Sequence, residues 1–389
     1  MASRIRLLFI VSSLGFGGAE KHVVALVNSL DRRRFQVSLA YLKDDAALLP
    51  QVDAGQLEGR LFCCFVGRRI DARAVRLLAA HVDDQAIDVL VCVNPYCLLY
   101  ATLAQRRSGR HSRLVELFHT TELGGIKDQL QMLFYRPFIA MTDMLVYVCE
   151  NQRSYWRARL LRARRDAVIH NGVDVAHFSD RFTTVQKILF RNDYGFTGND
   201  YVIGLCAAMR PEKAHDDLLQ AVARLSAERL PVKCLLVGDG PQRAAIEARI
   251  DALGLRRQVV ITGFMQDVRL AIAACDAMAI VSHHVETFSI AALEAMALRK
   301  PMIMSAIGGA TEQIRHGENG LLYPRGEIGA LATAVRMLAD RQRAQRMGDC
   351  ARRLVEEWFS ETVMVDAYER LFAGMVAVRR TDAFQKHAA

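Results

Sequence analysis

Several patterns that would settle the class of a protein early are missing from these 389 residues. No stretch approaches the ~18 consecutive apolar residues that a membrane-spanning helix needs, so the sequence predicts no transmembrane span. It contains no low-complexity tract and no internal repeat of ~20 to 50 residues, which excludes repeat architectures. With 52% hydrophobic and 24% charged residues, the composition is that of a globular protein and excludes intrinsic disorder.

The cysteines show neither a disulfide pattern nor a metal-binding pattern. There are nine, with one adjacent pair, Cys63 and Cys64, but no C-x-x-C motif, and most lie inside apolar strand-like runs. This placement indicates reduced thiols in a cytoplasmic protein and argues against a zinc site. His283 and His284 are adjacent, but no third metal ligand accompanies them, so we expect no bound metal.

The beginning of the chain shares one feature with a secretory signal. In MASRIRLLFIVSS, basic residues precede an apolar run, but that run, Leu7 to Val11, has only five residues and leads directly into a glycine loop. The apolar part of a signal peptide is longer, ~7 to 15 residues. We therefore interpret the run as a first β-strand.

Short apolar runs alternate with helical stretches along the whole chain, in two series. Continuous apolar strands separated by helices indicate parallel sheets covered on both faces, and the length fits two domains. We predict an α/β protein with two doubly wound, Rossmann-like domains, residues 1–180 and 181–364, with a polar hinge near residues 175–195 and a cleft between the domains. The predicted strands are IRLLFIVSS, QVSLAYL, LFCCFV, DVLVCVN, LVELFH, MLVYVC and AVIH, then YVIGLCAA, KCLLVG, QVVITG, DAMAIVS and PMIMS.

The positive charge lies mainly in the first half of the chain. Residues 1–189 contain 26 basic and 18 acidic residues, whereas residues 190–389 contain 25 and 24. In the densest part, QRSYWRARLLRARR at residues 152–165, six arginines flank apolar and aromatic residues. Such a helix suits an anionic membrane surface, but it fits equally well a solvated arginine face whose apolar stripe packs on its own core. No nucleic-acid-binding motif accompanies the charge, so we expect no nucleic-acid partner.

The loop after the first predicted strand is rich in glycine. In SSLGFGGAEKHVVALVNSL, Gly15, Gly17 and Gly18 let the backbone approach a ligand closely, and the following helix offers unpaired N–H groups to an anion. Glu20 stands where a dinucleotide-binding G-x-G-x-x-G motif has its last glycine. The loop fits either a ligand-binding role or a tight structural turn.

Two cations follow the first strand of the second series. In AAMRPEKAHDDLLQAV, Arg210 and Lys213 stand near a helix start, on the side of the sheet where ligands of parallel sheets bind. Two cations at this spacing can bind a diphosphate and neutralise the charge of a leaving group, although exposed cations are also common at helix starts.

Two carboxylates lie eight positions apart in a largely apolar stretch. In HHVETFSIAALEAM, residues 283–296, we predict Glu286 in a loop and Glu294 in a helix that starts near Ser289. Carboxylates suit sugar hydroxyls, and the amides of Phe288 to Ile290 are expected to be free for a phosphate. Alternatively, both carboxylates are structural and pair with cations or backbone amides.

Two further candidates follow predicted strands. His119 ends the run LVELFH, where it is either structural or catalytic. AIGGATEQI places Gly308 and Gly309 after another strand, with Glu312 behind them, and predicts a glycine turn on the ligand-binding side of the sheet.

Taken in order, these stretches resemble the retaining glycosyltransferases of family 4, which have the GT-B architecture. Each stretch alone is weak or moderate evidence, but the ordered set covers nearly the whole chain and is specific. The set consists of GFGGAE, VIHNGVD, RPEKAHDDLLQAV, LLVGDGPQR, ITGFMQDV, ETFSIAALEAMA with its Glu-x7-Glu pattern, IGGATEQI, GENGLLYP and the closing aromatic helix.

The resemblance implies transfer of a sugar from a nucleotide-sugar with retention of configuration, without a metal or other cofactor. It implies that Glu286 contacts the hydroxyls of the donor sugar and Glu294 those of the ribose. Arg210 and Lys213 would neutralise the diphosphate leaving group, and amides around Phe288, Ser289 and Ile290 would also contact the diphosphate.

In the first domain, the resemblance places Gly17 and Gly18 near the diphosphate and acceptor, and His119 beside the donor sugar. The expected catalytic residues are therefore Glu286, His119, Arg210 and Lys213. The implied mechanism is a front-face substitution in which the leaving diphosphate helps to deprotonate the acceptor, and Glu286 is not a covalent nucleophile. The resemblance also implies that residues after about 365 pack back onto the first domain.

The family's frequent roles imply a glycan or lipid-linked acceptor in cell-surface polysaccharide or lipopolysaccharide synthesis. The expected location is the cytoplasm, with possible contact of the basic first domain with the inner face of the membrane. Two other classes stay open: a nucleotide-sugar 2-epimerase of the same architecture, and a degenerate domain pair that only binds a glycan or nucleotide.

The chain departs from the family pattern at three positions. Val281 stands where a proline is common, Ser289 where glycine is frequent, and Arg299 where glycine is usual. Ser289 can cap the predicted helix. Arg299 either alters only a turn or reshapes the edge of the donor pocket.

Overall fold

The structure of this chain is a computed structural model that describes residues 4–121, 123, 125–284 and 286–387, with side chains up to residue 377. The chain divides into two compact units. Unit 1 consists of Met1–Asn171 and Glu361–Ala389, and unit 2 consists of Gly172–Ser360. The boundaries predicted from the sequence, at residues 180 and 364, lie nine and four residues later than these.

Unit 1 is built on one parallel sheet of seven strands in the order β3-β2-β1-β4-β5-β6-β7. Its strands are β1 (Ile5–Val11), β2 (Phe35–Tyr41), β3 (Leu61–Cys63), β4 (Val89–Val93), β5 (Arg113–Phe118), β6 (Met144–Tyr147) and β7 (Asp166–Val168). Its helices are α1 (Gly18–Ser29), α2 (Ala54–Leu57), α3 (Ala72–Asp84), α4 (Asn94–Arg107), α5 (Ile126–Ala140), α6 (Glu150–Ala158) and α15 (Glu361–His387), with a short 3-10 helix at Leu49–Gln51.

Both faces of the unit 1 sheet are buried, which explains why its strands are continuous apolar runs. On β1, Leu7 and Phe9 belong to a core that they share with residues of α1 and α15. Leu8 and Ile10, which point to the other face, belong to a second core that includes residues of α3, α4 and α5. Because successive side chains of a strand alternate, one apolar strand serves both cores.

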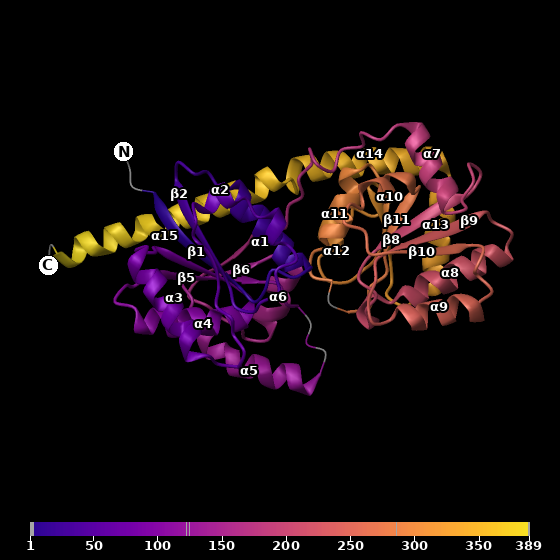
Figure 1. Cartoon of the computed structure of the whole chain (residues 1–389). Helices are drawn as coiled ribbons and strands as arrows, with labels where there is room; N and C mark the ends of the chain where they lie inside the picture. Colours follow the sequence, from indigo (N-terminus) through magenta and orange to yellow (C-terminus); the bar gives the residue numbers. More distant parts are fainter. Residues whose placement is uncertain (1–3, 122, 124, 285, 388–389) are drawn as a thin grey trace. The chain divides into compact units, whose positions relative to one another are not determined.

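The last helix belongs to unit 1. α15, yellow in Figure 1, runs along this unit and packs against α1 and β1. Its Tyr368 and Phe372 are fully buried, and the Phe372 ring lies 6.2 Å from that of Phe9 and 6.3 Å from that of Phe35 in edge-on contacts. The end of the chain therefore completes the core of the first unit.

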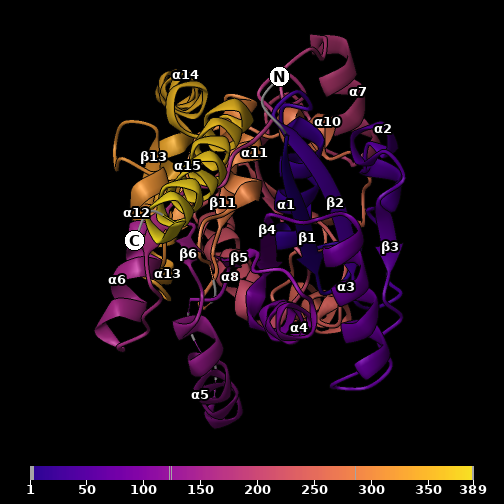
Figure 2. The same cartoon turned by 90° about the vertical axis from the view of Figure 1, so that its left-hand side faces the viewer.

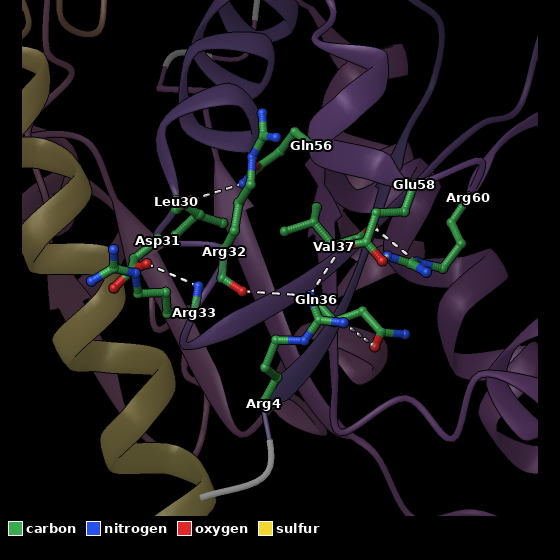
Figure 3. A network of polar contacts seen from close by, with 10 residues as sticks. All are labelled: Arg4, Leu30, Asp31, Arg32, Arg33, Gln36, Val37, Gln56, Glu58 and Arg60. Atoms are coloured by element: carbon green, nitrogen blue, oxygen red, sulfur yellow. Dashed lines mark hydrogen bonds and ion pairs between the residues drawn. The ribbon is translucent and has the colours of Figure 1, made fainter. Parts of the chain in front are cut away.

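Polar contacts fix the edge of the unit 1 sheet near β2 (Figure 3). The buried Gln56 side chain donates to the Leu30 carbonyl at 2.7 Å. Glu58 accepts from both Arg4 and Arg60 at 3.0 Å, which joins the start of β1 to the segment before β3. Charged and amide side chains thus help to hold this edge of the sheet.

Unit 2 has a parallel sheet of six strands in the order β10-β9-β8-β11-β12-β13. Its strands are β8 (Tyr201–Cys206), β9 (Val232–Val237), β10 (Val259–Gly263), β11 (Ala277–Ile280), β12 (Met302–Ser305) and β13 (Gly320–Tyr323). Its helices are α7 (Thr184–Asp193), α8 (His215–Ala227), α9 (Arg243–Ala252), α10 (Arg269–Ala274), α11 (Ile290–Ala297), α12 (Ala310–Gln313), α13 (Ile328–Leu338) and α14 (Arg341–Trp358), with a 3-10 helix at Pro211–Lys213.

Residues 172–180 belong to unit 2, and hydrogen bonds hold them to its last helix, α14. The Val173 amide donates to the Phe359 carbonyl at 3.0 Å. The Arg352 guanidinium on α14 donates to the carbonyls of Phe178 and Val175 at 2.9 and 3.0 Å. These bonds join residues that are far apart in sequence, so they could not be located from the sequence of the hinge.

The structure confirms the predicted fold class, since both units are parallel-sheet Rossmann-like folds, and each of the 12 predicted strand runs contains a strand. One strand, β13, was not predicted; its apolar residues LLY lie between the turn residues of GENG and Pro324. In the described parts of the chain, no helix is both long enough and apolar enough to cross a bilayer.

The segment predicted as a basic helix, residues 152–165, is helical only to Ala158. Two of its apolar side chains, Trp156 and Leu161, are buried in the core of unit 1, whereas Leu160 is 68% exposed. Three of its six arginines form ion pairs: Arg153 and Arg157 with Asp166, and Arg164 with Asp143. The structure therefore favours the second predicted interpretation, an arginine-rich face whose apolar residues pack on their own core.

Candidate active site

The candidate site of unit 2 lies where the strand order of the sheet reverses. β8 and β11 are neighbours, with Ala277 opposite Ile203, but β9 follows on the outer side of β8 and β12 on the outer side of β11. In doubly wound sheets, ligands bind outside the carboxyl ends of the strands at such a switch point. The two loops that leave these strands, residues 207–214 and 281–289, carry most of the residues predicted for the donor.

Lys213 and Glu286 meet between these loops. Lys213 Nζ lies 2.7 Å from Glu286 Oε2, and Ser282 Oγ donates to the same oxygen at 2.8 Å. The Glu286 side chain is only 10% exposed. Among the described residues, none forms a hydrogen bond with Glu286 Oε1. This oxygen is therefore available as an acceptor for a ligand hydroxyl.

The glycine turn after β12 packs against the backbone of Glu286 and Thr287. Gly308 has φ +52°, and a Cβ at this position would lie 1.8 Å from the Glu286 carbonyl oxygen. The Gly309 amide donates to the Thr287 carbonyl at 2.8 Å. The close approach of two backbones, and the positive φ, explain why a glycine stands at 308.

The start of α11 agrees with the predicted helix, but one of its expected phosphate-binding amides is occupied. Ser289 caps the helix by accepting from the Ala292 amide at 3.3 Å. The Ser289 amide itself donates to Oε1 of the buried Gln313 at 3.1 Å. The expectation that all amides of Phe288 to Ile290 are free is therefore wrong for Ser289, whereas the Ile290 amide has no described partner.

Glu294 and Phe288 lie deeper in unit 2. Glu294 is the fifth residue of α11 and is 6% exposed, with buried neighbours on the same helix. Phe288 is also buried, and its ring contacts that of Phe359 at 5.2 Å. Both residues therefore belong to the packed interior of unit 2.

Contacts of His283 join the loops that follow β8, β11 and β13. His283 Nε2 lies 2.6 Å from Oδ2 of the buried Asp217 on α8. The His283 amide donates to the Glu212 carbonyl at 2.9 Å, and its carbonyl accepts from Arg325 at 2.9 Å. His283 thus has a structural partner, and the described residues contain no group of three or more His, Cys, Asp or Glu side chains that could hold a metal ion.

The two predicted cations of this site differ in their surroundings. The Lys213 side chain forms an ion pair with Glu286, whereas the exposed Arg210 guanidinium forms no hydrogen bond or ion pair with the described residues. His215, two residues after Lys213, is buried, and neither ring nitrogen has a described partner. Burial and the nearby Lys213 lower the pKa of His215 to about 4, so the ring is neutral at pH 7.

Arg299 alters only a turn. Its φ is +59°, which explains why glycine is usual at this position, and its guanidinium pairs with Asp349 on α14 at 2.6 Å. The side chain is therefore held on the outside of α14.

In unit 1, the predicted glycine loop lies at the carboxyl end of β1. Gly17 precedes α1 and Gly18 is its first residue. A Cβ on Gly15 would lie 2.3 Å from the Asp45 carboxylate, and one on Gly17 would lie 2.1 Å from that of Glu20. The loop is packed tightly against acidic side chains as well as being placed where ligands bind.

His119 follows β5 in unit 1, and its backbone is held firmly. Its amide donates to Asn94 Oδ1 at 3.2 Å. The carbonyls on either side of it, those of Phe118 and Thr120, accept from the buried Gln152 at 2.7 and 3.0 Å, and Thr120 also accepts from Trp156 Nε1 at 2.8 Å. Gln152 and Trp156, both on α6, thus position the strand end that carries His119.

A second histidine, which the sequence did not reveal, lies beside His119. His22 on α1 is buried, and its ring lies 5.1 Å from that of His119 and 5.6 Å from that of Tyr368 on α15. Burial, and then His119, lower the pKa of His22 well below its usual value, and burial lowers the pKa of His119 to about 4. Both rings are therefore neutral at pH 7.

The structure thus brings together Lys213, Glu286 and the start of α11 in unit 2, and it places Gly17, Gly18 and His119 at strand ends of unit 1. Ser282, Asp217 and Gln313 were missed as supporting residues. Each lies in or next to a stretch that the sequence singled out, but only the fold shows which distant residue each one contacts.

Comparisons with known proteins agree with this arrangement. Residues 186–354 match the family model described as glycosyl transferases group 1, and residues 16–177 match that of glycosyltransferase family 4. The chain is 29% identical over 276 residues to N-acetyl-alpha-D-glucosaminyl L-malate synthase of Bacillus anthracis, covering 70% of each chain. It is 28% identical over 263 residues to O-antigen chain mannosyltransferase C of Escherichia coli, covering 64% of this chain and 67% of that protein.

The fold is similar to that of HepE of Anabaena, whose structure was solved in complex with UDP-glucose. The TM-score is 0.82 at 22% sequence identity, over 95% of this chain and 100% of that one. Fold and matches together define a glycosyltransferase with the GT-B architecture. Within that class, the chain belongs to glycosyltransferase family 4.

Proposed function

We propose that this glycosyltransferase moves a hexose from a nucleotide-sugar to a glycan or lipid-linked acceptor, with retention of anomeric configuration. The carboxylate of Glu286, held by Lys213 and Ser282 at the switch point of unit 2, is the observation that carries the proposal. One oxygen of this carboxylate is available to a sugar hydroxyl, and two cations stand on the neighbouring loop. The name of the HepE complex supports a nucleotide-sugar as donor.

In the proposed reaction, Arg210 and Lys213 neutralise the diphosphate as it leaves the sugar. Charge that develops on a leaving group is stabilised best by cations that are already in place. Glu286 binds hydroxyls of the transferred sugar, and Glu294 binds those of the ribose. The acceptor oxygen attacks from the side of the leaving diphosphate, which takes up the acceptor proton, so the sugar keeps its configuration.

The remaining assignments belong to the same proposal. Gly17, Gly18 and His119 of unit 1 serve the diphosphate, the acceptor and the donor sugar. No metal or other cofactor is required, because the two cations supply the positive charge. The product is a cell-surface polysaccharide or lipopolysaccharide, made by a cytoplasmic enzyme at the inner face of the membrane; O-antigen synthesis is named for one relative.

The proposal is tested by incubating the purified chain with single nucleotide-sugars and following the anomeric proton of the sugar by NMR. Without an acceptor, we expect slow hydrolysis of one donor to a sugar that first appears with the anomeric configuration of the donor. Isomerisation of the intact donor would instead identify an epimerase, and no reaction or binding with any donor would identify a degenerate binding protein. A loss of activity on addition of EDTA would contradict the absence of a metal.

A further inference from the structure

Helix α5 of unit 1 has two apolar faces on opposite sides. Met132, Tyr135 and Ile139 face the core of the unit and are buried. The other face is solvent-exposed, and no charged residue interrupts it. Its residues recur every three or four positions, as one side of a helix requires, and they are Ile126 (77% exposed), Leu130 (62%), Leu133 (62%), Phe134 (47%), Pro137 and Met141 (39%).

The exposed face of α5 lies at the periphery of unit 1. α5 packs against α4, and in both Figure 1 and Figure 2 it is the lowest element of the unit. All six residues from Ile126 to Gln131 are exposed, so the first part of the helix extends beyond the core that holds its second half. A run of large apolar side chains this exposed is uncommon on a soluble protein surface and marks an interaction site.

Cations surround this face. Lys127 is exposed at one edge of the stripe. The Arg136 guanidinium donates to the Arg159 carbonyl at 2.8 Å, and that of Arg106 lies 3.7 Å from the sulfur of Met141. No acidic side chain of the described residues forms an ion pair with any of these cations. Leu160, next to Arg159, adds another apolar side chain that is 68% exposed.

We propose that the exposed face of α5 docks onto an anionic lipid surface. The helix would lie in the plane of the membrane, with Ile126, Leu130, Leu133 and Phe134 among the acyl chains and the arginines at the headgroups. The segment after α6 contributes Leu160 and positive charge at the rim of this face.

The charges decide between a membrane and a second copy of the chain. Two copies that met through this face would bring Arg106, Arg136 and Lys127 of each close to the same cations of the other, which is unfavourable. An anionic bilayer accepts both the apolar stripe and its cationic rim. The inference deepens the proposed action on membrane-linked acceptors, but it requires neither donor nor acceptor, so it stands or falls independently of the enzymatic proposal.

Cosedimentation of the full chain with lipid vesicles tests the proposal. We expect binding to vesicles of phosphatidylcholine mixed with an equal amount of phosphatidylglycerol, and much weaker binding to phosphatidylcholine alone. The double substitution Leu130→Gln with Leu133→Gln should weaken binding to the anionic vesicles roughly tenfold or more. Arg106→Gln with Arg136→Gln should weaken it as well and should reduce its dependence on salt.

A matched control comes from a second exposed apolar stripe, on α7 of unit 2. Ile188 and Leu189 are 49% and 56% exposed, and the pair Ile188→Gln with Leu189→Gln should leave vesicle binding unchanged. Melting temperatures of all variants verify that they fold. Equal binding by the wild type and the α5 variant would overturn the proposal. So would a lack of vesicle binding together with a dimer in sedimentation velocity that the α5 variant abolishes, because the face would then join two copies.

Discussion

Lys213 and Glu286 form an ion pair, with Nζ and Oε2 2.7 Å apart, between the loops that follow β8 and β11. The pair is only 24% and 10% exposed, so each charge depends on the other for compensation. The same two side chains are those proposed to meet the diphosphate and the sugar. The donor would therefore bind to groups that are already positioned by each other, which reduces the cost of organising the site.

Lys213→Ala and Glu286→Ala should each lower kcat by roughly a hundredfold or more, because each removes a group proposed to act in the transition state. Turnover with the preferred donor and circular dichroism check this expectation together. Arg256→Ala is the control. It breaks an exposed ion pair with Asp251 and should leave kcat unchanged. Activity near that of the wild type in either site variant, with the fold intact, would remove the proposed role.

Because Lys213 and Glu286 form an ion pair, the stability losses of their two single substitutions should not be additive. Each single substitution leaves a partly buried charge without its partner, whereas the double variant leaves neither. The sum of the two losses in free energy of unfolding should exceed the loss of the double variant by about 1 kcal/mol or more. Urea unfolding of the four proteins measures this difference, and strict additivity would mean that the pair contributes no coupling.

Gly308→Ala should lower activity because the added Cβ would collide with the Glu286 carbonyl, 1.8 Å away. Gly326→Ala is a matched control: its φ is also positive, +76°, but nothing lies within 4 Å of a Cβ there. Both variants should lose about 1 to 2 kcal/mol of stability from the left-handed backbone. Only Gly308→Ala should also lose turnover, and equal turnover in the two would show that this turn does not support Glu286.

Replacement of Glu116 on β5 by an apolar residue should stabilise the protein. It is fully buried opposite Cys92, and neither carboxylate oxygen has a hydrogen-bond partner among the described residues. Burial raises the pKa of Glu116 well above its usual value. Glu116→Leu should raise the free energy of unfolding at pH 8 by about 1 to 3 kcal/mol, because it removes an unsatisfied polar group from an apolar core.

The gain from Glu116→Leu should depend on pH. Above the ordinary carboxyl pKa, the unfolded chain releases this proton while the folded chain retains it, so the wild type loses stability as pH rises. The stabilisation measured by urea unfolding should therefore be larger at pH 8 than at pH 4. Exposed Glu318→Leu is the control and should show no such difference. A gain that is the same at both pH values would contradict the raised pKa.

His215 should make the protein less stable in acid. Its folded pKa of about 4 lies below that of the unfolded chain, so between roughly pH 6.5 and pH 4 the unfolded state binds more protons and stability falls as pH falls. His215→Phe should flatten the pH dependence of the melting temperature over this range. His111→Phe, at an exposed position, should leave it unchanged. An unaltered slope in His215→Phe would show that the ring is protonated without cost.

The fold was predictable because its strands are continuous apolar runs, a pattern that follows directly from burial on both faces. β13 was missed because its apolar residues LLY lie between the glycines of GENG and Pro324, residues that are typical of turns. The structure divides the units at 171/172, before the predicted boundary at 180, and the hydrogen bond from the Val173 amide to the Phe359 carbonyl joins residues that are 186 positions apart. Local sequence patterns do not predict hydrogen bonds between residues so far apart in the chain.

The site was predictable as a set of segments but not as a set of contacts. Glycines and charged residues directly after apolar strands indicated the loops around Lys213, Glu286 and Gly308. The residues that hold them, such as Gln313 at the Ser289 amide, have no distinctive spacing. The sequence also left open what the apolar side of residues 152–165 contacts. An arginine-rich amphipathic pattern is the same whether Trp156 faces lipid or, as in the structure, the core of the protein.

The most direct test of the account is whether a nucleotide-sugar binds through Glu294. Melting temperatures of the full chain, measured with UDP, GDP, ADP, dTDP and CMP and with their common sugar conjugates, should rise with one nucleotide family only. In Glu294→Ala, that ligand-induced rise should be lost, even if the variant melts lower on its own. Stabilisation by no nucleotide, or a rise that Glu294→Ala retains in full, would contradict the proposed donor site.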